Sequence, residues 1–156
     1  MSENIIIIGN GVVDKELGHI IDKFDIVVRF KKFVTKGHEK YIGTKTDVMA
    51  WNLGHLMKED IGYCRRQLKG NKNGHILAYT PHKRHGLQQG LHRRQLDVIK
   101  KYEKEYNNFE FISMKNTLKI DDMYRKLYDN YNKYHMSTGL FYILYFLHIK
   151  QPIYIT

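Results

Sequence analysis

Two short motifs in this sequence carry residues that can bind a phosphorylated ligand. Gly9-Asn10-Gly11 ends an unbroken apolar run, and Ser137-Thr138-Gly139 precedes another. Glycine lets a backbone approach a ligand closely, and the N–H groups at the start of a helix attract anions. The motifs therefore indicate a nucleotide or phosphate site. The ordinary alternatives are a tight turn for the first motif and a helix N-cap for the second.

The glycine motif does not fit the dinucleotide pattern of NAD-binding proteins. That pattern, G-x-G-x-x-G, has a third glycine where this chain has Asp14. It also places an acidic residue for the ribose at the end of the second strand, where this chain has Arg29. NAD is therefore disfavoured. NADP remains an alternative, because an arginine can bind its 2′-phosphate.

The elements that position these motifs alternate between strands and helices. The run Ile5–Ile8 is β-branched and closed by glycine, which is typical of a strand buried on both faces of a parallel sheet. The alternation predicts a single layered α/β domain over residues 1–156, with ligands bound beyond the carboxyl ends of the strands. We expect strands at residues 4–8, 25–30, 47–51, 75–79, 109–113 and 152–156, and helices at 12–21, 56–68, 88–106, 120–131 and 137–148.

Composition narrows the class of partner. The chain has 26 Lys and Arg against 16 Asp and Glu, and this net charge of +10 attracts phosphorylated ligands, nucleic acid or anionic surfaces. The clusters His82-Lys83-Arg84-His85 and His92-Arg93-Arg94 suit an anionic acceptor, phosphate or RNA, or else form a solvated loop.

Cys64 is the single cysteine, and the opening apolar run is too short to span a bilayer. We therefore expect a cytoplasmic protein.

The motifs and their order resemble the sialyltransferases of glycosyltransferase family 29, and the bacterial sialyltransferases of family 42 are similar at the same places. The long motif of family 29 joins a strand and Gly-Asn to a second strand ending in arginine and to a Gly-x-(Lys/Arg)-Thr segment. The short motif joins Ser/Thr-Gly to an apolar helix and a strand. The corresponding residues here are Ile8-Gly9-Asn10, Ile21-Asp22-Lys23-Phe24-Asp25, Val27-Val28-Arg29 and Gly43-Thr44-Lys45-Thr46-Asp47 for the long motif, and Ser137-Thr138-Gly139 through Pro152-Ile153-Tyr154-Ile155-Thr156 for the short one.

The resemblance implies a Rossmann-like three-layer domain with a mostly parallel sheet, similar to a GT-A variant. It implies CMP-sialic acid or another CMP-sugar as donor, and an inverting transfer to a glycan acceptor with no metal and no further cofactor. We expect Asp121-Asp122 at a helix N-terminus rather than in a metal-binding Asp-x-Asp loop. The residues expected to bind the nucleotide are Gly9, Asn10, Gly11, Arg29, Lys31, Ser137, Thr138 and Gly139.

The sequence departs from the family at three places. Lys31 stands where the family has an asparagine that helps to hold the nucleotide. The family's paired cysteines are replaced by Ile5 and His148, which fits a cytosolic protein. The histidine proposed as catalytic base in the family lies beyond the strand at residues 152–156, so we expect a chain truncated at its C-terminus and assign no catalytic residue. His135 is the nearest substitute, with a loop histidine as the ordinary interpretation.

Two other functions stay open at this point. One is a basic nucleic-acid-binding α/β protein that uses the cationic residues between 82 and 94. The other is an NADP-binding Rossmann-like enzyme that uses Arg29.

Overall fold

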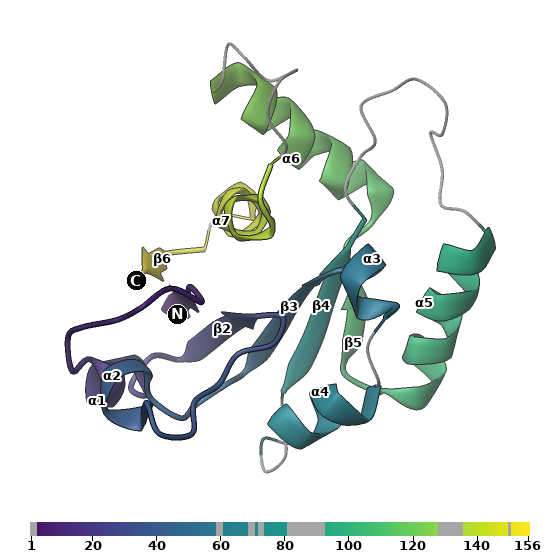
Figure 1. Ribbon diagram of the computed structural model, residues 1–156. Coiled ribbons are helices and arrows are strands. Elements are labelled where there is room, and N and C mark those ends of the chain that lie inside the picture. Colours follow the sequence, from purple (N-terminus) through teal and green to yellow (C-terminus); the bar gives the residue numbers. More distant parts are fainter. Residues whose placement is uncertain are drawn as a thin grey trace.

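The computed structural model describes residues 3–58, 61–68, 71, 74–80, 93–127, 136–149 and 151–156 (Figure 1). Its strands are β1 (Ile5–Ile8), β2 (Ile26–Phe30), β3 (Val48–Asn52), β4 (His75–Tyr79), β5 (Phe109–Phe111) and β6 (Ile153–Ile155). In the described residues these strands form one parallel sheet of six strands, in the order β5-β4-β3-β2-β1-β6. The chain moves outward from β1 to β5 and then returns to place β6 on the other side of β1. The connections therefore diverge at β1, the position where ligands bind in open α/β sheets.

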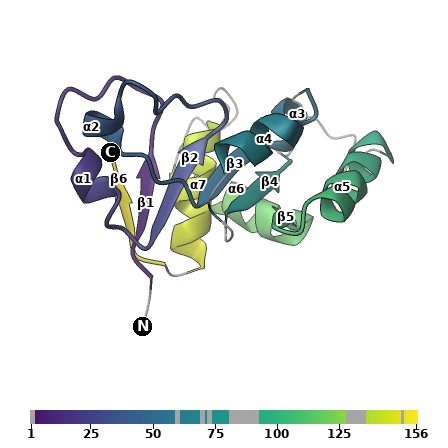
Figure 2. The ribbon, with the colours of Figure 1, turned by 90° about the horizontal axis from the view of Figure 1, so that it is seen from below.

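Helices cover both faces of this sheet (Figure 2). They are α1 (Gly18–Ile21), α2 (Glu39–Ile42), α3 (Leu53–Leu56), α4 (Ile61–Gln67), α5 (Arg93–Glu105), α6 (Met114–Leu127) and α7 (Thr138–His148). Side chains alternate along β1, so Ile5 and Ile7 pack with buried residues of α6 and α7, whereas Ile6 and Ile8 pack on the opposite face with Ile21 of α1. Buried residues of α3, α4 and α5 cover that opposite face over β3, β4 and β5. The layers confirm the predicted Rossmann-like α/β fold.

Tyr142 ties α7 to the middle of the sheet. Its side chain is fully buried, and its hydroxyl oxygen lies 2.6 Å from the carbonyl oxygen of Leu77 in β4 and 2.9 Å from that of Trp51 in β3. The same oxygen accepts a hydrogen bond of 3.2 Å from the N–H of Trp51. Burial raises the pKa of Tyr142 well above the ordinary tyrosine value, so the hydroxyl stays neutral and can donate. These contacts fix the position of α7, whose first turn carries the Ser-Thr-Gly motif.

The helix predicted at residues 12–21 is much shorter in the structure. Only Gly18–Ile21 is helical, and residues 12–17 have no regular structure. Val12 is fully exposed instead of packing on the sheet, and two β-branched residues in succession favour a helix weakly. The helix predicted at residues 56–68 is likewise divided between α3 and α4.

Helix α6 begins earlier than predicted. Ser113 caps it, because its Oγ accepts a hydrogen bond of 3.3 Å from the N–H of Asn116. Asp121 and Asp122 therefore lie inside α6, not at its N-terminus as predicted, and each pairs with a cation one turn further on. The pairs are Asp121 with Arg125 and Asp122 with Lys126. No helix in the described part of the chain combines the length and apolarity that crossing a membrane requires.

Candidate nucleotide site at the carboxyl edge of the sheet

The glycine turn lies at the carboxyl end of β1, between the ends of β2 and β6. Asn10 donates a hydrogen bond of 3.1 Å from its side-chain amide to the carbonyl oxygen of Phe30, the last residue of β2. The N–H of Gly9 donates to the carbonyl oxygen of Thr156 at 3.3 Å. All three residues of the Gly-Asn-Gly motif are exposed. The turn is therefore anchored on both sides while its surface stays open to a ligand.

The Ser-Thr-Gly motif forms the start of α7 at the same edge. Ser137 is the N-cap, and its Oγ accepts a hydrogen bond of 3.2 Å from the N–H of Leu140. A Cβ placed on Gly139 would lie 3.8 Å from the ring of Phe30. Phe30 thus neighbours both motifs, since its carbonyl oxygen binds Asn10 and its ring faces Gly139. Phe30 is not among the residues predicted for the site, and its only signal in the sequence is its position at the end of a predicted strand.

Tyr79 holds the first turn of α7 against the ends of β3 and β4. Its ring is buried and stacks on Phe141, with the ring centroids 3.6 Å apart and the planes 5° from parallel. Burial raises the pKa of Tyr79, and side-chain hydrogen bonds with Thr138 and Asn52 oppose this shift. Thr138, expected to contact the nucleotide, is therefore also part of the contact between α7 and the sheet. Tyr79 and Asn52 are further residues of this edge that are not among those predicted for the site.

Lys31 turns the chain immediately after β2. It is the one non-glycine residue with positive φ in the described ranges, at 49°, and its N–H donates to the carbonyl oxygen of Ala50 at 3.2 Å. This left-handed conformation is disfavoured for lysine and tolerated by asparagine. Lys31 is half-buried beside Phe30, so it lies at the same edge as both motifs.

Arg29 lies below this edge, on the sheet face opposite α7. Its side chain is 1% exposed. Nε donates to the carbonyl oxygen of Lys45 at 3.1 Å and to Thr46 Oγ1 at 3.2 Å, and Nη2 donates to the carbonyl oxygen of Ile42 at 2.6 Å. Burial lowers the pKa of Arg29 to about 10, against the attraction of Asp22 and Asp47, so the guanidinium stays charged at neutral pH. These bonds organise residues 42–46, and a contact between Arg29 and a nucleotide stays a prediction.

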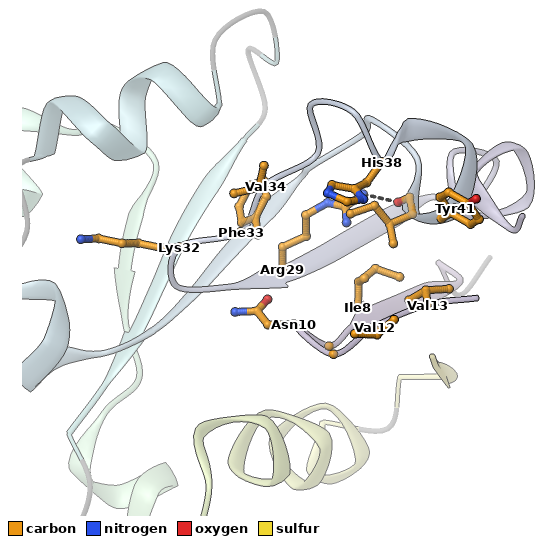
Figure 3. A pocket seen from close by; sticks show the side chains of 13 residues that line it. Ile8, Asn10, Val12, Val13, Arg29, Lys32, Phe33, Val34, His38 and Tyr41 are labelled. Atoms are coloured by element: carbon orange, nitrogen blue, oxygen red, sulfur yellow. Dashed lines mark hydrogen bonds between the residues drawn. The ribbon is translucent and has the colours of Figure 1, made fainter. Parts of the chain in front are cut away.

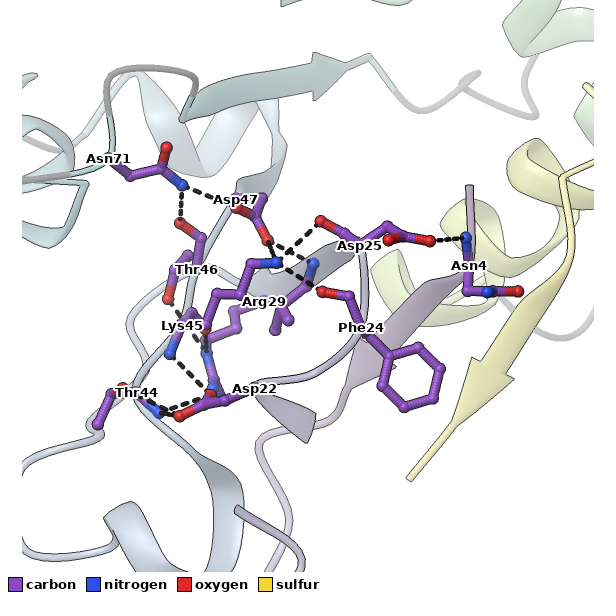
Figure 4. A network of polar contacts seen from close by, with 11 residues as sticks. Asn4, Asp22, Phe24, Asp25, Arg29, Thr44, Lys45, Thr46, Asp47 and Asn71 are labelled. Carbon is purple, nitrogen blue, oxygen red and sulfur yellow. Dashed lines mark hydrogen bonds and ion pairs between the residues drawn. The ribbon is translucent and has the colours of Figure 1, made fainter. Parts of the chain in front are cut away.

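A network of carboxylates supports the same segment (Figure 4). Asp22 accepts hydrogen bonds from the N–H groups of Thr44 and Lys45, both at 2.9 Å. Asp47 accepts from the N–H of Val27 at 2.8 Å and from the side-chain amide of Asn71 at 2.8 Å. Since these acids belong to the long motif, part of that motif holds the fold rather than a ligand.

A cavity of about 330 Å³ opens beside the glycine turn (Figure 3). Its lining residues fall between positions 8 and 42, and they include Asn10, Arg29 and His38. Ser137, Thr138 and Gly139 do not line it. The predicted nucleotide-binding residues are therefore divided: Gly9, Asn10, Gly11 and Arg29 line this cavity, whereas the Ser-Thr-Gly motif lies outside it at the start of α7.

Several sequence predictions concern residues outside the described ranges. These are His135 and the cationic positions 82–85 and 92. Arg93 and Arg94 are exposed at the start of α5.

Comparison with models of protein families gives a match over nearly the whole chain. The family model described as glycosyltransferase family 29 (sialyltransferase) matches residues 3–154, which is nearly the whole chain. No curated protein matches the sequence.

Proposed function

Since the chain belongs to glycosyltransferase family 29, the sialyltransferases, we propose that it binds a CMP-sugar donor, with CMP-sialic acid as the first candidate. The proposed site is the carboxyl edge of the sheet, between the glycine turn and the start of α7. The proposal rests on the position of Phe30. Its carbonyl oxygen accepts a hydrogen bond from the side chain of Asn10, and its ring faces Gly139. Through Phe30, motifs from opposite ends of the chain meet at one edge.

The groups at this edge suit the phosphate of CMP. The N-terminus of α7 provides unpaired N–H groups and the positive end of a helix of 11 residues. Ser137 Oγ accepts the Leu140 N–H, so its own proton can be donated to a phosphate oxygen. Lys31 adds a positive charge beside the turn. These donors would stabilise the charge that develops on the CMP leaving group without a metal ion.

The proposed reaction is a single displacement at the anomeric carbon of the donor sugar. An acceptor hydroxyl oxygen forms the new bond as the bond to the CMP phosphate oxygen breaks, and the hydroxyl proton passes to a base. The direct attack inverts the anomeric configuration. The base is not assigned to any residue of this chain.

A thermal-shift titration in EDTA tests the donor site. CMP at about a hundred times its dissociation constant adds about 2.7 kcal/mol and should raise the melting temperature by several degrees. Lys31→Ala should reduce this shift, and Lys119→Ala, which removes an exposed lysine of α6, should leave it unchanged. If neither CMP nor CMP-sialic acid alters the melting temperature, the proposal fails. A shift that appears only after Mg²⁺ is added would contradict metal independence.

The alternative functions are tested in the same titration with NADP and a short RNA. The NADP hypothesis depends on Arg29 as the residue that binds the 2′-phosphate. In the structure, Nε and Nη2 of Arg29 are bound to protein oxygens. A response to RNA that falls steeply with salt, with no response to CMP, would favour nucleic-acid binding instead.

A further inference from the structure

The cavity beside the glycine turn has the properties of a second binding site. Its volume of about 330 Å³ is at the lower end of the range for small-molecule pockets. It lies between the glycine turn and residues 32–42, and its lining includes no residue of α7. The cavity therefore shares Gly9, Asn10 and Gly11 with the proposed donor site, but it does not extend to the start of α7.

The walls of the cavity combine polar and apolar side chains. Ile8 and Phe33 are buried in them, while Val12 and Val34 stand at the surface (Figure 3). Val12 is fully exposed and Val34 is 66% exposed. Large apolar side chains that gather at the rim of a cavity are typical of ligand sites. An apolar ligand body would remove both valines from water.

The cavity is also lined by Arg29, whose guanidinium has one nitrogen without a hydrogen-bond partner among the described residues. Arg29 Nη1 is buried and has no hydrogen-bond partner among the described residues, whereas Nε and Nη2 bind protein oxygens. A buried donor of a charged group that lacks a partner is destabilising. Lys32 also lines the cavity, and its side chain points away from Arg29 (Figure 3). The cavity is therefore suited to one carboxylate, since a single nitrogen of the guanidinium is left to bind it.

We propose that this cavity binds a small carboxylate with an apolar body. The carboxylate lies over Arg29 Nη1, and the apolar body packs against Phe33, Val12 and Val34. Because Nη1 is covered in the empty cavity, an exposed side chain at the rim must turn outward as the ligand enters. Val34 and His38 are exposed residues that line the cavity, and the proposal requires one of the exposed lining side chains to move.

NMR titration with 3-phenylpropanoate tests the proposal, with 3-phenylpropanamide as the neutral control of the same shape. The carboxylate should shift the methyl signals of Val12, Val13 and Val34 and the Nε–H signal of Arg29, and leave the methyl signals of Leu147 in α7 unchanged. The amide should bind at least about tenfold more weakly, because it cannot pair with the guanidinium. Equal binding of acid and amide, or no shift with either at millimolar concentration, would overturn the proposal. Equal shifts with inorganic phosphate would also overturn it, since they would show a plain anion site.

A pair of variants at the rim tests the role of charge without disturbing Arg29. Val34→Asp should weaken 3-phenylpropanoate binding about tenfold by like-charge repulsion, whereas Val34→Asn should retain most of it. Position 34 is exposed, so neither change threatens the fold. If the two variants bind the carboxylate equally, the charge of the ligand is not recognised and the proposal is wrong. The readout needs no CMP, so it stands even if the donor-site proposal fails.

Discussion

The side-chain amide of Asn10 donates a hydrogen bond of 3.1 Å to the carbonyl oxygen of Phe30, which joins the turn after β1 to the end of β2. The donor is an N–H group, so a carboxylate at position 10 cannot replace it. In the proposed donor site, Asn10 therefore shapes the turn as well as offering contacts to the nucleotide.

Replacement of Asn10 by Asp or Ala should weaken CMP binding and cost about 0.5–1.5 kcal/mol of unfolding free energy, the net value of one hydrogen bond. Asn10→Asp should weaken CMP binding more than Asn10→Ala does, because the negative charge of aspartate repels the phosphate. Isothermal calorimetry measures the first effect and urea denaturation the second. Asn4→Ala, at an exposed position before β1, is the control. Unchanged CMP affinity in both Asn10 variants would show that the turn is not part of the site.

Lys31 should be a position where a substitution stabilises the protein. Its φ of 49° is costly for lysine, and asparagine adopts this conformation more readily. Lys31→Asn should therefore raise the unfolding free energy by about 0.5–1 kcal/mol, and Lys31→Val should lower it by at least about 1 kcal/mol. Urea denaturation measures both. Lys32→Asn, at the next residue, should give no gain, and a gain of equal size there would argue against the strain at position 31.

Gly43 and Gly37 allow the stability cost of backbone strain to be measured separately from the cost of a steric clash by an added Cβ. Both have positive φ, at 70° and 85°. A Cβ on Gly37 would meet open space, whereas a Cβ on Gly43 would collide with the carboxylate of Asp22. That carboxylate binds the N–H groups of Thr44 and Lys45, so moving it would leave them unsatisfied.

The alanine variants should therefore differ in stability. Gly37→Ala should cost about 1 kcal/mol, and Gly43→Ala about 3 kcal/mol or more. Equal losses in chemical denaturation would mean that the Asp22 contacts contribute nothing. Each variant should be compared with the unchanged protein at the same pH.

The strands of the sheet could be predicted from the sequence because their signal is local. Ile5–Ile8 is an unbroken β-branched run closed by glycine, and β4 spans the predicted residues His75–Tyr79. The wrong prediction of a helix at residues 12–21 came from apolar spacing alone. Val12 has that spacing, yet it faces solvent at the rim of a cavity, and no local pattern distinguishes the two situations.

The meeting of the two motifs could be expected only from the resemblance to a family. Its physical basis is the contact of Phe30 with Asn10 and Gly139 and the hydrogen bond between Tyr79 and Thr138. These contacts join segments far apart in the chain, so residue type at either end carries no signal of them. The same holds for Arg29: its place after two valines predicted a site at a strand end, but its burial depends on residues 42–46 folding over it.

Tyr142 gives a stability prediction with a defined pH dependence. At neutral pH, Tyr142→Phe leaves a buried Leu77 carbonyl and a Trp51 N–H without their hydroxyl partner, so it should cost about 1–3 kcal/mol. The folded pKa of Tyr142 is raised by burial, and the unfolded pKa is about 10. Above pH 10 the unfolded protein releases this proton and the folded protein keeps it, so the hydroxyl's contribution to stability is lost as the pH rises.

The unfolding free energy of the unchanged protein exceeds that of Tyr142→Phe, and this difference (the gap) should therefore become smaller above pH 10. It should fall by at most about 1.4 kcal/mol per pH unit. The effects of Arg29 and of the other tyrosines on alkaline stability are common to both proteins and cancel in the difference. Urea denaturation of both proteins from pH 7 to 11 measures the gap. Tyr41→Phe, at a half-buried position on α2, is the comparison for the loss of a tyrosine hydroxyl away from the middle of the sheet. A gap that stays constant to pH 11 would mean that Tyr142 ionises in the folded state as readily as in the unfolded chain, which contradicts its burial between α7 and the sheet.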